Sequence, residues 1–165
     1  IEKDKKSAQS ATKRLDKVLT GYFDDVSQNI PERYFDLLIC NDVLEHINHY
    51  HDFLDDIKTK LSDDGVLILS IPNVRFLPNL LELLFYKDWR YREAGILDKT
   101  HLRFFTKRSM IRTLNENGWI IDKIGGINRY GSKRYSPKRL LSFLGQCLLG
   151  FDTAYMQFGI RTHKK

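Results

Sequence analysis

The hydrophobic pattern is clearest between residues 34 and 73, where two apolar runs enclose an amphipathic segment. The runs Phe35–Cys40 and Val66–Ile71 have the length and continuity of strands that are buried on both faces. Between them lies a helical pattern that ends at the turn signal 63–65, Asp-Asp-Gly. Two buried strands joined by a helix predict a right-handed β-α-β unit in a parallel sheet. The apolar positions of the helix are Phe53, Leu54, Ile57 and Leu61.

Polar residues follow each predicted strand. Residues 41–46, Asn-Asp-Val-Leu-Glu-His, come directly after the first strand, and residues 70–73, Ser-Ile-Pro-Asn, close the second. In open sheets of this kind ligands bind beyond the carboxyl ends of the strands, so we expect the chemistry of the protein there.

The segments before and after this unit are less regular. A short helix face (Ala8, Ala11, Leu15) precedes a predicted strand at 17–20. Residues 74–91 predict a helix with Pro78 in its first turn, followed by a loop at 95–106 that is dense in functional side chains. Two interpretations of the apolar segment 74–91 stay open: it packs on the core, or residues 74–106 form a lid on the substrate side.

The remaining elements complete an α/β domain. Thr106 predicts the N-cap of a helix over 107–117, and a strand follows at 119–124. Residues 127–150 combine a basic loop (Arg129, Lys133, Arg134, Lys138, Arg139) with a leucine-rich helix (Leu140, Leu141, Leu144, Leu148). The segment 153–160 predicts an antiparallel edge strand. We therefore expect one domain over 1–165, with a Rossmann-like, mostly parallel sheet and helices on both faces.

The charge distribution suggests which ligands the domain binds, and the cysteines and hydropathy suggest its compartment. Residues 1–72 carry 9 basic and 14 acidic residues, a net of −5, and residues 73–165 carry 18 and 7, a net of +11. The acidic half suits a cationic ligand or a metal, and the basic half suits an anionic substrate, nucleic acid or membrane surface. Cys40 and Cys147 predict reduced thiols, and no apolar run approaches the roughly 20 residues of a membrane span, which together suit a cytoplasmic protein.

Three segments resemble one enzyme family. FDLLICNDVLEH at 35–46, LILSIPN at 67–73 and GILDKTHLRFFT at 95–106 are similar to class I S-adenosylmethionine-dependent methyltransferases. The match is greatest with bacterial members that occur in surface-polysaccharide gene sets, and it runs over about residues 1–126. The resemblance implies a Rossmann-like fold and transfer of a methyl group to a hydroxyl of a sugar, glycolipid or small metabolite.

The resemblance also exposes a gap. The family begins with a strand, a glycine-rich ExGxG-type loop and a helix, and its second strand ends in an acid. Here Ile1-Glu2 would be the end of that second strand, and the sequence has no glycine-rich loop. Tyr22 also stands where the family often has an aspartate near the adenine. The sequence starts without Met, so we expect a fragment of a whole methyltransferase rather than a natural remnant.

The resemblance suggests roles for individual residues. Glu2 would hold the ribose hydroxyls of the cofactor, and Asn41 and Asp42 would line its pocket. The candidate bases are His46 and His101. Asn73, Asp98 and Arg103 would contact the substrate; Asp98 is also placed to orient His101 or to pair with Arg103. Asp42, Glu45 and His46 have the spacing of metal ligands, and their oxygen and imidazole groups would suit Mg²⁺ or Mn²⁺.

Alternative functions follow from the same features. A non-catalytic module would use the truncated fold as a scaffold for a partner. Nucleic-acid binding ranks last, because the basic half has few interleaved aromatic residues beyond Tyr130 and Tyr135. The helix 138–149 has basic residues at its start and leucines along it, which suits a membrane surface, a dimer interface or the core.

Overall fold

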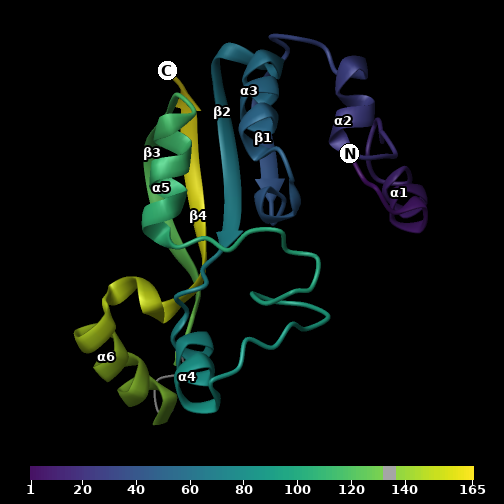
Figure 1. Ribbon diagram of the computed structural model, residues 1–165. Helices are drawn as coiled ribbons and strands as arrows, with labels where there is room; N and C mark the ends of the chain where they lie inside the picture. The colour runs from purple at the N-terminus through teal and green to yellow at the C-terminus, as the bar shows by residue number, and fades with distance from the viewer. Residues whose placement is uncertain (132–136) are drawn as a thin grey trace.

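The computed structural model describes residues 1–131 and 137–165 of the chain. These residues form a four-stranded sheet of order β1-β2-β4-β3 (Figure 1). The strands are β1 (Phe35–Asn41), β2 (Leu61–Pro72), β3 (Trp119–Arg129) and β4 (Tyr155–Lys164). The helices are α1 (Lys5–Ala11), α2 (Phe23–Val26), α3 (Tyr50–Lys60), α4 (Leu77–Tyr86), α5 (Lys107–Glu116) and α6 (Pro137–Leu149), with single turns η1 (Ser27–Asn29), η2 (Leu44–His46) and η3 (Phe151–Ala154).

The predicted β-α-β unit is confirmed. Strands β1 and β2 pair in parallel, and α3 buries Phe53, Leu54 and Ile57 against them. Strand β2 begins at Leu61, earlier than predicted, so the expected turn at 63–65 lies inside it. The pairing jumps there from Phe35–Leu61 to Leu37–Val66, which means that the turn residues are accommodated as an irregularity of the ladder.

The C-terminal strand β4 occupies the interior of the sheet. It is antiparallel to both β2 and β3, as the segment 153–160 predicted. The prediction that this strand forms an edge was wrong, because β3 is the outer strand on this side. Sequence order gave no sign of this insertion. Strands β2 and β3 are not hydrogen-bonded to each other, and β4 lies between them and pairs with both.

Only one face of the sheet carries helices in the described part of the chain, although we expected helices on both. Leu67, Leu69 and Ile71 of β2 point to the face where α3 and α5 pack, and all three are buried. Leu37 and Ile39 of β1 point to the other face and remain 48% and 59% exposed. The prediction that β1 is buried on both faces was therefore wrong. It is an edge strand that pairs only with β2 among the described residues.

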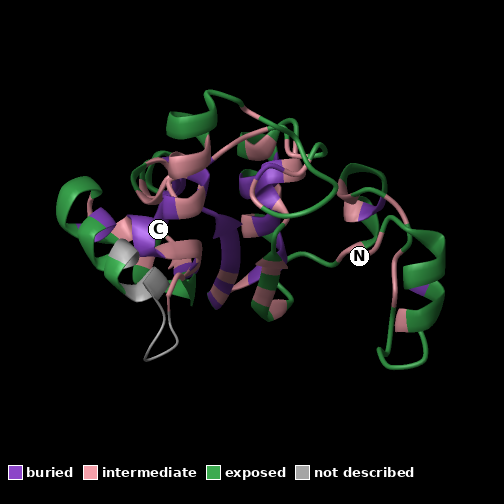
Figure 2. Ribbon diagram, turned by 90° about the horizontal axis from the view of Figure 1, so that it is seen from below, coloured by how far each residue is buried: buried purple, intermediate pink, exposed green. Residues whose placement is uncertain are grey.

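The N-terminal residues lie beyond β1, away from the rest of the sheet (Figure 1). Helix α1 forms around Ala8 and Ala11 as predicted, with the Asp4 carboxylate accepting a hydrogen bond from the Ser7 N–H, but it ends at Ala11 and so does not include Leu15. The predicted strand at 17–20 was wrong, since this segment makes only a single parallel bridge between Thr20 and Glu2. Figure 2 shows α1 mostly exposed, in contrast to the buried middle of the sheet.

Local capping explains the elements that follow β2. Helix α4 has Pro78 in its first turn, as predicted, and it ends at Lys87 in a left-handed conformation. Thr106 caps α5 and exchanges hydrogen bonds with Ser109 in a capping box. Helix α6 forms over the predicted range. Lys133, Arg134 and Tyr135, and the side chains of Lys138, Arg139 and Leu141, lie outside the described residues, so their predicted roles stay predictions. In the part of the chain that is described, no helix has the length and apolar character to cross a membrane.

Candidate active site

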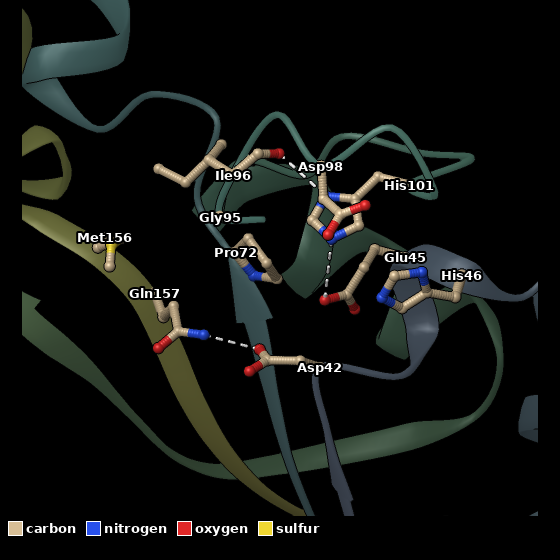
Figure 3. A pocket seen from close by; sticks show the side chains of 10 residues that line it. All are labelled: Asp42, Glu45, His46, Pro72, Gly95, Ile96, Asp98, His101, Met156 and Gln157. Carbon is tan, nitrogen blue, oxygen red and sulfur yellow. Dashed lines mark hydrogen bonds and ion pairs between the residues drawn. The ribbon is translucent and has the colours of Figure 1, made fainter. Parts of the chain in front are cut away.

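A pocket of about 190 Å³ lies at the carboxyl ends of β1 and β2 (Figure 3). This is the place that the sequence pattern predicted. Four segments build it: the residues after β1, the end of β2, the loop between α4 and α5, and the start of β4. The residues that line it are Asp42, Glu45, His46, Pro72, Gly95, Ile96, Asp98, His101, Met156 and Gln157.

Glu45 is the buried acid of this pocket. It lies in the single turn η2, and the residue is only 1% exposed. Neither oxygen of its carboxylate has a hydrogen-bond partner among the described residues. Loss of water raises the pKa of Glu45 to about 7, and the nearby charge of Asp42 adds to this rise. A buried acid without partners is costly for the fold, so it indicates a group that meets a proton, a substrate or a cation.

His101 faces this acid. Its Nδ1 lies 2.9 Å from the carbonyl oxygen of Ile96, and its Nε2 lies 3.9 Å from Oε1 of Glu45 (Figure 3). Because a carbonyl oxygen can only accept, Nδ1 carries the hydrogen in this network. The neutral imidazole therefore presents the lone pair of Nε2 to Glu45 and the pocket.

His46 is held in the same tautomer by the same loop. Its Nδ1 lies 3.1 Å from the carbonyl oxygen of Thr100 and 3.2 Å from the hydroxyl oxygen of that residue. The rings of His46 and His101 pack edge to face, with centroids 4.7 Å apart. One ligand atom from each of Glu45, His46 and His101 lies within 4.8 Å of the other two. This trio can share a proton or surround a cation.

Asp42 serves a different part of the pocket. The backbone turns there with a φ of 50°, and Oδ1 accepts hydrogen bonds from the side chains of Gln157 at 2.7 Å and Ser70 at 3.2 Å. The carboxylate is thereby fixed toward β2 and β4. The structure groups His101, and not Asp42, with Glu45 and His46, so it changes the metal-ligand set that spacing alone suggested.

Asp98 and Arg103 make contacts other than those expected. The Asp98 carboxylate accepts hydrogen bonds from the N–H and hydroxyl of Thr100, both at 2.7 Å, and these bonds lower the pKa of Asp98. Asp98 thus orients the partner of His46. Its carboxylate makes no described bond to the ring of His101, but its carbonyl oxygen accepts a hydrogen bond from the His101 N–H, so Asp98 positions the backbone of His101. Arg103 donates to the carbonyl oxygen of Asn48 and lies over the ring of Tyr50, so the expected pair with Asp98 is absent from the described contacts.

The other predicted site residues lie outside the pocket lining. Asn73 is fully buried: its amide donates to the carbonyl oxygens of Asp152 and Tyr155, and its side-chain oxygen accepts from the N–H of Arg75. Its substrate contact stays a prediction, and the amide would have to leave these partners to make it. Asn41 ends β1, and Glu2 accepts from the N–H of Asp4. Their cofactor roles also stay predictions.

Two contributions were missed in the sequence. Gln157, which holds Asp42, comes from β4, and nothing in the weak alternation of that segment marked it as a site residue. The carbonyl oxygen of Ile96 fixes the tautomer of His101, and a backbone group leaves no signal in residue identity.

Comparison with known proteins identifies the family. Residues 2–124 match the model of the family described as "Methyltransferase domain". The chain belongs to this family.

One relative in sequence and two solved structures agree with this assignment. The chain is 29% identical over 117 residues to the mitochondrial ubiquinone biosynthesis O-methyltransferase of Schizosaccharomyces pombe, a match that covers 68% of this chain and 42% of that protein. Two solved structures of S-adenosylmethionine-dependent methyltransferases share the fold. The one from Archaeoglobus fulgidus has a TM-score of 0.68 and 14% identity, and the match covers 99% of this chain and 73% of that one. The one from Mesorhizobium loti has a TM-score of 0.56 and 13% identity, and the match covers 98% of this chain and 77% of that one. The predicted α/β, Rossmann-like fold is thereby confirmed, apart from the interior place of β4 and the helices on a single face described above.

The raised pKa of Glu45 predicts a pH-dependent stability. The pKa in the folded domain is about 7, against an ordinary value of 4.5, so the neutral carboxyl is favoured by folding. This contribution is fully present below about pH 4.5 and is lost as the pH rises through about 7. Relative to Glu45→Gln, the wild type should therefore lose roughly 3 kcal/mol of unfolding free energy across this window.

Denaturant titrations of both proteins at a series of pH values measure this difference. The matched control is Glu116→Gln, which removes a carboxylate from an exposed position on α5. A difference between wild type and Glu45→Gln that stays constant with pH would contradict the burial of an ionisable acid at this position.

Proposed function

We propose that this methyltransferase domain transfers a methyl group from S-adenosylmethionine to a hydroxyl of a small metabolite or glycan. One observation carries the proposal: the buried acid Glu45, to which no described residue donates a hydrogen bond, lies 3.9 Å from Nε2 of His101 in a pocket at the strand ends. A hydroxyl becomes a better nucleophile when a base removes its proton, and this pair is built to accept one.

The residues divide the work as follows. Nε2 of His101 takes the proton of the acceptor hydroxyl, and the ionised carboxylate of Glu45 stabilises the resulting imidazolium. The hydrogen bond from Nδ1 to Ile96 keeps the ring in place during this change. S-adenosylmethionine, when bound, supplies a methyl group on a positively charged sulfur. Asp42, whose carboxylate is fixed by Gln157 and Ser70, places a negative charge at the strand ends, which suits that cation.

The described residues supply part of a cofactor site. Acids stand at Glu2 and Asp42, but no glycine-rich loop occurs in the sequence. The outer edge of β1 is unpaired within the described chain, and Leu37 and Ile39 beside it are exposed. We propose that a further strand, followed by a glycine-rich loop, completes the sheet and the cofactor site at this edge, with Glu2 and Asn41 on either side of it.

The acceptor class rests on two kinds of support. The S. pombe relative is named as an O-methyltransferase, which favours a hydroxyl over other acceptors. The quoted motifs resemble bacterial polysaccharide-associated enzymes, which favours a sugar or glycolipid. A cytoplasmic location belongs to the same proposal.

A second candidate role for the trio is cation binding. Glu45, His46 and His101 bring one oxygen and two imidazole nitrogens within 4.8 Å, and the Nδ1–H of each ring is held by a backbone carbonyl. Such carbonyl partners are typical of metal-binding histidines. Mg²⁺ or Mn²⁺ at this position would polarise the acceptor hydroxyl in place of a base.

One assay tests both roles. The full-length protein, with the further strand and glycine-rich loop proposed above, is purified and incubated with methyl-labelled S-adenosylmethionine and a panel of sugars and phenols, with and without a chelator. We expect labelled product, and activity that survives the chelator supports proton transfer by His101, whereas activity restored only by Mg²⁺ or Mn²⁺ supports the cation. If equilibrium dialysis detects no binding of the donor and no label is transferred, the scaffold function replaces the enzymatic one.

A further inference from the structure

Helix α6 carries several large apolar side chains on the outside of the molecule, among the side chains that the structure describes. Leu140, Leu144 and Leu148 recur every fourth residue, and they are 65%, 49% and 82% exposed. Phe143 on the same helix and Phe151 directly after it are also exposed, at 58% and 74%. We call these five residues the α6 apolar stripe. The sequence pattern left open whether this helix face packs on the core, and the structure shows that it does not.

The opposite side of α6 is the one that packs on the domain. Gly145 and Gln146 are buried there. A Cβ atom at Gly145 would lie only 2.6 Å from a methyl carbon of Leu77, so the close approach of α6 to α4 requires glycine. Among the side chains of α6 that the structure describes, Gly145 and Gln146 face the protein and the most exposed ones are large and apolar, which is the reverse of an ordinary surface helix.

Apolar groups also gather on the neighbouring helix. The last turn of α4 exposes Leu84, Phe85 and Tyr86, each by two thirds or more. Helices α4 and α6 lie together at the end of the molecule beyond the carboxyl end of β2 (Figure 1). Monomeric proteins seldom expose so many large apolar side chains in one region unless something binds there.

The charge around α6 indicates what binds. Between Asp122 and Asp152 the sequence has no acidic residue and six basic ones. Amphipathic helices with leucine and phenylalanine on one face and basic residues nearby lie in the interface of anionic membranes. A symmetric dimer through the same helix would bring two copies of this positive segment together, and their repulsion opposes it.

We propose that α6 docks the protein on an anionic lipid surface, with the α6 apolar stripe between the headgroups and the acyl chains. The net positive charge of this part of the sequence then attracts the lipid phosphates. The pocket with Glu45 and His101 is not part of this surface, so the proposal is independent of the proposed methyl transfer.

Co-sedimentation with vesicles tests the proposal. The purified protein should bind vesicles of phosphatidylcholine that contain about one third phosphatidylglycerol, and bind vesicles of phosphatidylcholine alone much more weakly. Leu144→Gln and Leu148→Gln should each lower the partition coefficient by about tenfold, because each removes one apolar side chain from the bilayer. The matched control is Leu15→Gln, which changes an exposed leucine near α1 and should leave binding unchanged.

Circular dichroism and light scattering separate the outcomes. All three positions are exposed, so the variants should keep the wild-type spectrum. The proposal is overturned if the wild type does not bind the anionic vesicles, or if Leu148→Gln binds as well as the wild type. It is also overturned if the wild type is a dimer that Leu148→Gln converts to a monomer without any vesicle binding, since the stripe would then be a contact between two copies.

Discussion

Replacing His101 with asparagine should lower the kcat of methyl transfer by about 10²- to 10⁴-fold, the range that removal of a general base produces. Asparagine keeps a donor near the Ile96 carbonyl, but it has no basic nitrogen facing Glu45. KM for the acceptor should change little, because the proton moves only during the reaction. Steady-state kinetics with labelled donor over a range of acceptor concentrations measures both constants.

The matched control is His49→Asn, because His49 is exposed and absent from the pocket lining. Its kcat should stay near that of the wild type. A His101→Asn variant with unchanged kcat would remove His101 from the chemistry. If His46→Asn and His101→Asn lose activity equally and both fail to bind Mg²⁺ in calorimetry, the cation is the better account of the trio.

Replacing Asn73 with alanine should lower the free energy of unfolding by about 3–5 kcal/mol. The substitution removes three hydrogen bonds in a region that water does not reach easily: those to the carbonyl oxygens of Asp152 and Tyr155 and the one from the N–H of Arg75. The Asp152 oxygen keeps the N–H of Tyr155 as a partner. These bonds join the end of β2 to the start of β4. Denaturant unfolding followed by circular dichroism measures the loss.

Asn79→Ala is the matched control, since Asn79 is almost as buried but donates only one described hydrogen bond, to the carbonyl oxygen of Val74. It should cost about 1–2 kcal/mol. If Asn73→Ala is no more destabilising than Asn79→Ala, the amide of Asn73 is available, and its predicted contact with the substrate gains support.

Patterns confined to one element predicted their structures well. Phe53, Leu54 and Ile57 marked α3 because a helix brings residues three and four apart onto one face. Thr106 marked the start of α5 because its hydroxyl satisfies an N–H that the helix leaves free. In each case the interaction that decides the structure joins residues close in sequence.

Errors arose where distant segments decide the outcome. The run Phe35–Cys40 was interpreted as buried on both faces, yet Leu37 and Ile39 are exposed because the described chain provides neither a second neighbour for β1 nor a helix over that face. The segment 153–160 was placed at an edge, but it pairs with both β2 and β3. A strand's own sequence does not specify how many neighbours it has.

By itself, the sequence determined that this protein has an α/β fold with polar residues at the ends of two parallel strands, because alternation and capping depend on neighbouring residues. It also supplied Glu45, His46 and His101 as separate candidates. Only the tertiary structure decided that these three meet and that backbone carbonyls of the loop bearing His101 set both imidazole tautomers. It also decided that no described residue donates a hydrogen bond to the carboxylate of Glu45. The physical reason is distance along the chain: 55 positions separate His46 from His101, and the folding of the loop over η2 is what removes water from Glu45.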